Sequence, residues 1–458
     1  MAEKSNLLQG KKHIHFIGIG GSGMFPLAQI LHKEGYYLTG SDNNESDILK
    51  MVRALGIPVT MGQKAENIEG ADLIVHTAAI MEDNPELIAA KASGVPTIER
   101  SVLLGIITER YSDCICVSGT HGKTTTTAML TQILLDADMD PSAVIGGKLK
   151  SINSYGRSGD SEIMTCEACE FVDTFLHLSP DIAVVLNIDC DHMDYFKTMD
   201  NLKLSFEKFC NKASKAIIYN GDNENTVEVV KRIQGKKKIS YGIMDTNEYY
   251  PKNITHIDGL HTRYDLYHQG EFLTTLDIHV PGDHNIGNSV AACAASLEAG
   301  TPVEKLAKGL DAFKGAGRRF ELLGKVNGVT IVDDYAHHPA EIAATLKAAK
   351  SLKFNQVWAV HQPFTYSRTK MLLDDFAEAL SIADHTVLTE IMGSREKNTY
   401  HIYAKDLADK IDGCVWFPTQ QEVADYVLQH AKAGDLVITL GCGDIYKAAK
   451  IMLNGHYE

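Results

Sequence analysis

Residues 118–127 read Ser-Gly-Thr-His-Gly-Lys-Thr-Thr-Thr-Thr and follow the short apolar run Cys114–Val117. An apolar run, a glycine turn and Lys-Thr are typical of a loop that holds the phosphates of a nucleoside triphosphate. Backbone N–H groups and the lysine face phosphate oxygens in such a loop, and the hydroxyl after the lysine can hold Mg²⁺. The apolar residues within 128–135 predict a helix whose positive N-terminal end faces the phosphates. The alternative is a plain glycine turn with a solvated lysine.

This loop is a shortened variant of the common phosphate loop. The common form, Gly-x-x-x-x-Gly-Lys, begins with a glycine at the place that Val117 occupies here. The first glycine is Gly119, three residues before Gly122. We expect the contacts to the triphosphate to come from the loop residues Gly119, Thr120, His121, Gly122, Lys123, Thr124 and Thr125.

The composition fits an enzyme of several domains. A chain of 458 residues should hold roughly three domains, because domains run about 100–200 residues. The 44 Lys and Arg residues stand against 59 Asp and Glu residues, a net charge of −15 that argues against a nucleic-acid-binding protein. The first residues lack the apolar core of a signal peptide, and no apolar run reaches the roughly 18 residues of a membrane helix. We therefore expect a cytoplasmic protein without membrane contact.

The nine cysteines show no paired spacing of the kind that zinc sites have. Cys166 and Cys169 form a Cys-x-x-Cys, but no second pair follows. We expect free thiols in a reducing compartment.

A second glycine cluster lies near the start of the chain. An apolar stretch, 13–19, leads into Gly18, Gly20 and Gly23, and Asp42 follows about 20 residues on, as in the dinucleotide fingerprint. NAD is the usual ligand of this pattern. UDP satisfies it equally, because the physical requirement is a diphosphate on a helix N-terminus with an acid near a ribose. A tight turn without a ligand is the third possibility.

Polar residues also follow two strand-like runs after the phosphate loop. The run 163–166 leads to Glu167 and Glu170, and the run 182–188 leads to the segment Asp189–His192. Parallel strands bring their carboxyl ends to one edge of a sheet, so Glu167 and His192 can complete Mg²⁺ sites begun by Thr124. The alternative is that these side chains only cap the strand ends.

The remaining sequence predicts further α/β structure. The segment 241–280 alternates as in β-strands, and the segment around Asn288 opens an Ala-rich helix, where an amide can read an adenine edge or simply start the helix. Pro339 suits the first turn of another helix, after the strand-like run 330–333. Three later strands are predicted at 357–360, 386–388 and 436–440.

Taken together, these motifs resemble the Mur ligases, the ATP-dependent amide-forming enzymes of peptidoglycan precursor synthesis. The resemblance runs nearly end to end. It is carried by Gly18–Met24, Ser118–Thr126, Glu167–Glu170, Asn187–His192, Pro281–Asn285, Gly317–Phe320, Asp333–Pro339 and Gly441–Asp444. The first glycine motif and the Asp-Tyr-Ala-His-His-Pro run point to the alanine-adding branch of the family.

The resemblance implies an α/β fold of three domains. Residues 1–112 would form a Rossmann-like domain for the UDP-sugar, 113–323 a central P-loop-type ATPase domain, and 324–458 a mobile Rossmann-like domain for the amino acid. It also implies the partners ATP, Mg²⁺, UDP-N-acetylmuramate and L-alanine. The muramyl carboxylate would attack the γ-phosphate, and alanine would then displace phosphate from the acyl phosphate.

The resemblance also implies roles for individual residues. The catalytic group would be Lys123, His192, Arg319 and His337, and the metal ligands Thr124, Glu167 and His192. ATP would contact Asn288, Arg319, Asp334 and Tyr335 besides the phosphate loop. The UDP-sugar would contact Gly18, Gly20, Gly21, Ser22, Gly23, Asp42, His76 and Thr77. Arg368 would pair with the carboxylate of the amino acid.

The sequence departs from the family at three places. Glu-Ala-Asp-Glu of the family is Glu-Ala-Cys-Glu here, and Phe364 and Thr365 replace a histidine and a frequent arginine before Arg368. Ser-Val-Leu-Leu follows Arg100 where the family often has Ala-Glu-Met-Leu. Three other functions stay open: a ligase that recycles murein tripeptide, an NAD-dependent oxidoreductase, and a non-catalytic nucleotide sensor.

Overall fold

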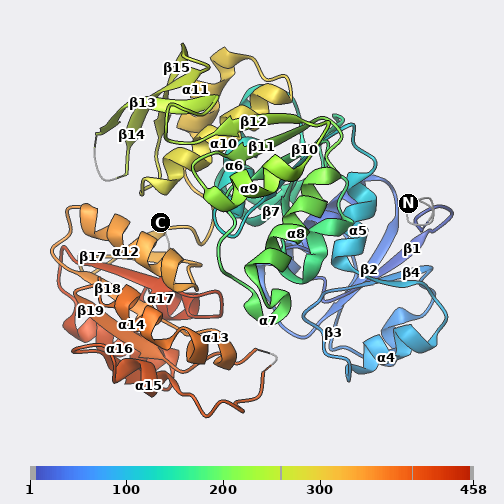
Figure 1. Ribbon diagram of the computed structural model, residues 1–458. Helices are drawn as coiled ribbons and strands as arrows, with labels where there is room; N and C mark the ends of the chain where they lie inside the picture. Colours follow the sequence, from blue (N-terminus) through green and yellow to red (C-terminus); the bar gives the residue numbers. More distant parts are fainter. Residues whose placement is uncertain (1–6, 258–259, 395, 454–458) are drawn as a thin grey trace. The chain divides into compact units, whose positions relative to one another are not determined.

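The computed structural model describes residues 7–257, 260–394 and 396–453 (Figure 1). The chain is mixed α/β with three sheets. It forms two compact units, one of residues up to 254 with 264–277 and 286–313, the other of 255–263, 278–285 and residues from 314 on. Among the described residues, no helix has both the length and the apolar character needed to cross a membrane.

The first sheet has five parallel strands in the order β3-β2-β1-β4-β5. The strands are β1 (His13–Ile17), β2 (Tyr37–Asp42), β3 (Val59–Met61), β4 (Leu73–His76) and β5 (Thr97–Glu99), and the helices are α2 (Phe25–Lys33), α3 (Asp47–Ala54), η1 (Ala65–Ile68), α4 (Pro85–Ala92) and α5 (Arg100–Thr108). The chain order reverses between β1 and β4. Ligands of open α/β sheets bind at such a switch point, outside the carboxyl ends of the strands.

The second sheet has ten strands in the order β15-β14-β13-β12-β11-β10-β6-β9-β7-β8. The strands are β6 (Asp113–Ser118), β7 (Ser142–Leu149), β8 (Ser154–Arg157), β9 (Ile163–Ala168), β10 (Ile182–Val185), β11 (Ala216–Asn220), β12 (Lys237–Tyr241), β13 (Tyr249–His256), β14 (Thr262–His268) and β15 (Glu271–Ile278). Its helices are α6 (Lys123–Asp136), η2 (Lys150–Ile152), η3 (Phe171–His177), α7 (Met193–Phe196), α8 (Met199–Asn211), α9 (Glu224–Arg232), α10 (His284–Glu298) and α11 (Val303–Ala312).

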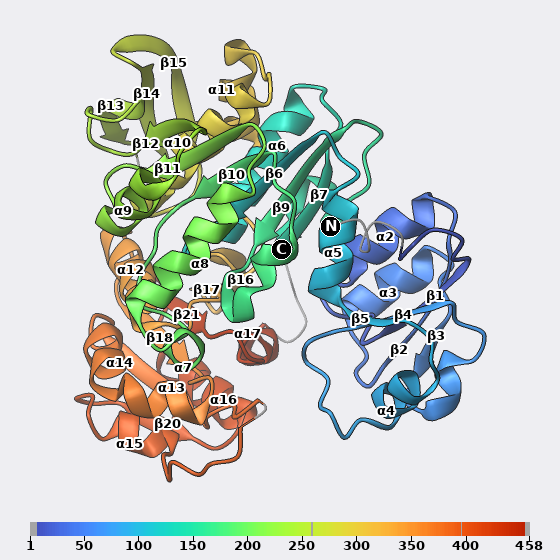
Figure 2. The ribbon, with the colours of Figure 1, turned by 45° about the vertical axis from the view of Figure 1, so that its right-hand side comes forward.

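Strand β6 lies between β9 and β10, and both pairs are parallel (Figure 2). All residues of β10 and nearly all of β6 are buried, as expected for parallel strands covered on both faces. The segments that follow the three strands therefore meet at one edge of the sheet. This arrangement confirms the expectation that the phosphate loop, Glu167 and the segment before His192 share an edge.

The first two sheets share one continuous apolar core. It includes Phe16 and Leu27 from the first sheet and its helices, and Val185 and Phe206 from the second. Helix α5 packs closely on η3: a side chain at Gly105 would come within 2.3 Å of the carbonyl oxygen of His177. Apart from the ends of β13, β14 and β15, both sheets accordingly fall in the same compact unit.

The third sheet belongs to the second unit and has the order β16-β17-β21-β18-β19-β20. Its strands are β16 (Glu321–Val326), β17 (Val329–Asp334), β18 (Val357–His361), β19 (His385–Thr389), β20 (Val415–Phe417) and β21 (Leu436–Leu440), and its helices are α12 (Pro339–Ser351), α13 (Tyr366–Met371), α14 (Leu373–Leu380), α15 (Ala404–Ala408), α16 (Gln420–His430) and α17 (Tyr446–Met452). Among the described strands of this sheet, β16 alone pairs antiparallel, with β17.

Most strands and helices lie where the sequence predicts them, with small shifts at their ends. Strand β9 continues through Glu167 to Ala168 instead of ending at Cys166, and β10 ends at Val185 instead of Ile188. The proposed border at 112 falls between α5 and β6, whereas the border at 323 falls inside β16. The three-domain division stays a prediction.

Candidate functional site

The phosphate-loop sequence forms a tight turn between β6 and α6. Gly119 and Gly122 have φ angles of 138° and 87°, values that side chains other than glycine rarely adopt. A Cβ at Gly119 would lie 2.9 Å from the Cβ of Leu186, and one at Gly122 would lie 2.6 Å from Oδ1 of Asn288. Both glycines are therefore required by conformation and by space. The same contact places the Asn288 amide, on α10, beside the loop.

The loop is held by the segment that follows β10. The His121 N–H donates to Oδ1 of Asn187 (2.7 Å), and the Asn187 amide donates back to the His121 carbonyl (3.1 Å). The Thr120 N–H donates to the Asn187 carbonyl (3.1 Å), and the Thr120 hydroxyl accepts from the Asp189 N–H (2.9 Å). Sequence reasoning gave Asn187 no role. Its amide side chain stands directly after a buried strand, in the same motif as His192, and this position could have indicated a role at the site.

We expect Asn187→Ala to weaken ATP binding about tenfold and to cost about 1–3 kcal/mol of stability, because the loop loses both side-chain hydrogen bonds and exposes unpaired backbone groups. The measurements are KM for ATP and chemical denaturation. Asn211→Ala is the matched control, since the Asn211 amide lies on the exposed face of α8, where it donates to the Glu207 carbonyl. An Asn187→Ala enzyme with an unchanged KM for ATP would contradict this role of Asn187.

Lys123 starts α6 and points back over its own loop. Its Nζ donates to the carbonyls of Gly119 and Thr120 and lies 3.0 Å from Oε2 of Glu170. Glu170 is buried, with 1% of its surface exposed. Burial is the largest single effect and acts to lower the pKa of Lys123. The charge and hydrogen bond of Glu170, together with the nearby Cys169 and Glu167, act in the opposite direction and outweigh it, so that the pKa is raised. The lysine is therefore charged and held at the loop.

The predicted metal ligands come from three neighbouring segments. Thr124 is buried in the first turn of α6, and Glu167 lies near the end of β9, where its Oε1 accepts from the Gly146 N–H (2.5 Å). His192 lies just before α7 and has φ = 55°. The centre of its ring is 4.6 Å from the centre of the Phe171 ring, and its Nε2 atom is 3.6 Å from Oδ2 of Asp191. The hydroxyl and carboxylate oxygens are donors that Mg²⁺ prefers, so Thr124 and Glu167 fit that ion.

The glycine turn of the first sheet follows β1. Gly18 has φ = 81°, and a Cβ there would lie 2.6 Å from the Thr77 side chain. Oδ2 of Asp42 accepts from the Gly20 N–H (2.9 Å), so this acid already holds the turn. Gly21, Ser22 and Gly23 complete the half-buried turn, and His76 ends the neighbouring strand β4. The structure thus brings all eight residues assigned to the UDP-sugar to one strand edge.

Most of the predicted residues of the second unit lie around the carboxyl end of β17. Arg319 lies over the Tyr335 ring, 4.9 Å from its centre, and His337 Nδ1 lies 3.1 Å from the Tyr335 carbonyl and 3.3 Å from Oε2 of Glu341. Asp334 accepts from the N–H groups of Ala336 (2.7 Å) and Phe320 (2.8 Å). Arg368 lies half-buried on α13.

Arg318, which sequence reasoning left unassigned, holds this part of the second unit together. It donates to Oδ2 of Asp333 (2.8 Å) and to the carbonyls of Gly441 (2.6 Å) and Gly443 (3.2 Å). Its guanidinium also lies over the rings of Tyr335 and Tyr446. Both adjacent arginines therefore lie over the Tyr335 ring, and Arg318 is in addition tied into the fold by its hydrogen bonds.

The free energy of unfolding should depend on pH because of the buried Asp334 carboxyl. Burial raises its pKa to about 6, although Arg319 and two backbone N–H groups act in the opposite direction. The unfolded carboxyl, with a pKa of about 3.9, ionises first, so the free energy of unfolding falls as pH rises from about 4 to about 6, by about 3 kcal/mol. Asp334→Asn should lack this fall. Denaturation of both proteins across this range is the measurement, and a pH-independent difference between them would contradict the assignment.

Comparisons with known proteins agree with this geometry. Three family models match: the Mur ligase family catalytic domain over residues 13–112, the Mur ligase middle domain over 117–296, and the Mur ligase glutamate ligase domain over 318–443. A UDP-N-acetylmuramate–L-alanine ligase of Agathobacter rectalis is 46% identical over 96% of this chain and 97% of that protein. One of Acetivibrio thermocellus is 41% identical over 96% of both.

A solved structure shows the same fold. The UDP-N-acetylmuramate–alanine ligase of Thermotoga maritima superposes with a TM-score of 0.83 at 26% identity, covering 97% of this chain and 98% of that one. The family models, the identity to full-length relatives and the phosphate-loop geometry lead to one assignment. The chain belongs to the Mur ligase family of amide-forming ligases.

Proposed function

We propose that this chain acts in the cytoplasm, where it uses ATP to join L-alanine to the lactyl carboxylate of UDP-N-acetylmuramate during peptidoglycan precursor synthesis. The observation that carries the proposal is the 46% identity, over nearly the full chain, to a protein of that name. The order of strands supports it, because β6, β9 and β10 bring the phosphate loop, the end of β9 with Glu167 and the start of the segment that leads to His192 to one edge of the sheet.

The residues of that edge suit the transfer of a phosphoryl group to a carboxylate. The Lys123 ammonium, now paired with Glu170, can turn to the oxygens of the transferring group and offset their charge. Thr124 and Glu167 would hold the Mg²⁺ of ATP, and His192 a second ion. Bound Mg²⁺ would reduce the repulsion between the triphosphate and the substrate carboxylate.

The residues of the other sheets would bind the remaining groups. The turn Gly18–Gly23 would hold the diphosphate of the UDP-sugar at the start of α2, while His76 and Thr77 would line the same strand edge. Asn288, Asp334 and Tyr335 would hold adenine and ribose, Arg319 and His337 would face the reacting phosphate, and Arg368 would bind the alanine carboxylate.

One assay tests the proposal and its rivals. Phosphate release from ATP is measured with UDP-N-acetylmuramate and each of L-alanine, glycine, L-serine and murein tripeptide in turn. We expect release to be fastest with L-alanine. Release with the tripeptide alone would favour a recycling ligase instead. Absence of turnover together with reduction of NAD by a substrate would favour an oxidoreductase, and nucleotide binding without any turnover would favour a sensor.

His192→Ala should slow formation of the acyl phosphate about 100-fold while ATP binding changes little, because the proposed second metal serves the carboxylate. Rapid-quench measurement of phosphoryl transfer, alongside calorimetry of ATP binding, separates the two effects. His32→Ala, an exposed histidine of α2, is the control. Full turnover of His192→Ala at low Mg²⁺ would contradict the assignment.

A further inference from the structure

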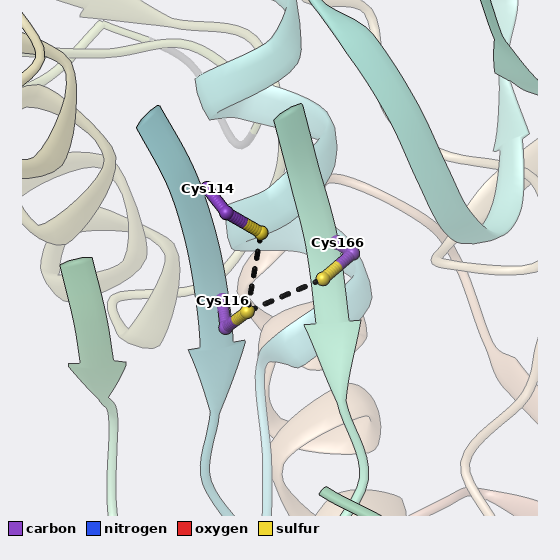
Figure 3. Close-up of side chains that lie close together, drawn as sticks. All are labelled: Cys114, Cys116 and Cys166. Atoms are coloured by element: carbon purple, nitrogen blue, oxygen red, sulfur yellow. Dashed lines mark hydrogen bonds between the residues drawn. The ribbon is translucent and has the colours of Figure 1, made fainter. Parts of the chain in front are cut away.

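Three buried cysteines meet in the core of the first unit (Figure 3). Cys114 and Cys116 lie on one face of β6, and Cys166 is the register partner of Cys116 on β9. The sulfur atoms are 3.7 Å apart for Cys114 and Cys116 and 3.4 Å apart for Cys116 and Cys166, and all three lie within 4.8 Å of one another. Each of the three residues has 0% exposed surface. The proposed catalysis uses none of these thiols.

The spacing of the sulfurs fits one shared three-coordinate centre. With bonds of about 2.3 Å to sulfur, a planar centre sets its three sulfurs about 4 Å apart, and a pyramidal centre sets them closer. The two shortest separations, 3.4 and 3.7 Å, therefore favour a pyramidal centre. Trivalent arsenic has this geometry because it carries a lone pair.

Charge selects among the ions that bind thiolates. The cluster lies in an apolar core with Leu103 and Phe175, and Asp181, which accepts the Cys114 N–H at 2.9 Å, is an anion. Three thiolates would leave Zn²⁺ with one net negative charge and Cu⁺ with two, and an uncompensated buried charge is costly. A trivalent arsenic centre with three thiolates is neutral.

The thiols can also react. Cys114, Cys116 and Cys166 are all free cysteines. Each of the three can therefore give up a proton and bind through its sulfur.

We propose that Cys114, Cys116 and Cys166 form a binding site for a trivalent arsenical of the arsenous acid class. Three As–O bonds break and three As–S bonds form. Each hydroxyl leaves as water with a proton from a thiol, or from solvent where the thiol has already lost its own, and no atom changes its oxidation state. The bound centre would join β6 to β9 one residue before Glu167.

The test uses the full-length protein, reduced with a phosphine so that no added thiol competes. It is incubated with sodium arsenite and desalted, and arsenic per chain is measured by elemental mass spectrometry. We expect one arsenic per chain and an X-ray absorption spectrum with three sulfurs and no oxygen around it. Zn²⁺ in place of arsenite should not be retained.

Variants locate the site. Cys116→Ala should lower the retained arsenic at least about tenfold, because two thiolates hold arsenic less tightly than three. Cys210→Ala and Cys293→Ala, which remove buried free thiols outside the cluster, should retain it fully. If Cys116→Ala does not fold, the number of sulfur ligands in the wild-type spectrum decides whether arsenic is bound by three thiolates.

Any of the following results would overturn the proposal: a shell of fewer than three sulfurs, full retention by folded Cys116→Ala, or uptake by the urea-unfolded chain alone. Retention of Zn²⁺ by the cluster would also overturn it, since the argument from charge would then fail.

Discussion

Lys123→Ala should lower kcat/KM about 1,000-fold, because one positive charge at the transferring phosphoryl group is lost. It should also cost about 3–5 kcal/mol of stability, since Glu170 would remain buried and charged without its partner. Steady-state kinetics and chemical denaturation measure the two effects. Binding of UDP-N-acetylmuramate should be unchanged in calorimetry, because the proposed sugar site lies on the first sheet.

A second substitution separates the two effects. Lys123→Ala combined with Glu170→Gln should recover most of the lost stability, because no buried charge is left unpaired, but it should recover no activity. Lys215→Ala is the matched control: Lys215 pairs with Asp113 at the opposite end of β6, on the surface, where such pairs contribute about 1 kcal/mol or less. A folded Lys123→Ala protein that turns over normally would remove Lys123 from the mechanism.

Arg318→Ala should be the most destabilising change in the second unit, by about 3–5 kcal/mol, because Asp333 would remain buried with its charge unpaired. Asp333 is 1% exposed and would keep only the Thr439 hydroxyl as a side-chain partner among the hydrogen bonds described. Arg318→Lys should rescue little, since one ammonium cannot reproduce a fork that reaches a carboxylate and two carbonyls. Thermal and chemical denaturation measure the loss.

The neighbouring arginine supplies the comparison. Arg319→Ala should lower turnover by about 100-fold or more, as expected for a donor to the reacting phosphate, with a much smaller loss of stability than Arg318→Ala. Affinity for the UDP-sugar should change little. If the two variants exchange these phenotypes, the assignment of the two arginines is wrong.

The fold could be predicted from the sequence because its strands are short apolar runs that end in recognisable turns. The phosphate loop, the glycine turn after β1 and Pro339 each have a local conformational reason for their residues. These conformational requirements involve only residues that are close in the chain. They therefore predict where a strand or helix lies, but not which strands become its neighbours in the sheet.

The parts that sequence reasoning missed depend on which strands become neighbours. Asn187 clamps His121 only because β10 lies beside β6, and Arg318 reaches Gly441 only because β21 lies beside β17. The cysteine cluster is the clearest case. Spacing along the chain gave no metal site, and only the register of Cys116 with Cys166 brings the thiols together.

The close contact at Gly105 limits how this protein can be divided. Helix α5 buries Leu103, Ile106 and Ile107 in a core that continues into the second sheet. A fragment that stops at residue 112 would present this apolar surface to water and would be prone to aggregate. Crystallographers who want the sugar-binding sheet should therefore express residues 1–313 as one piece.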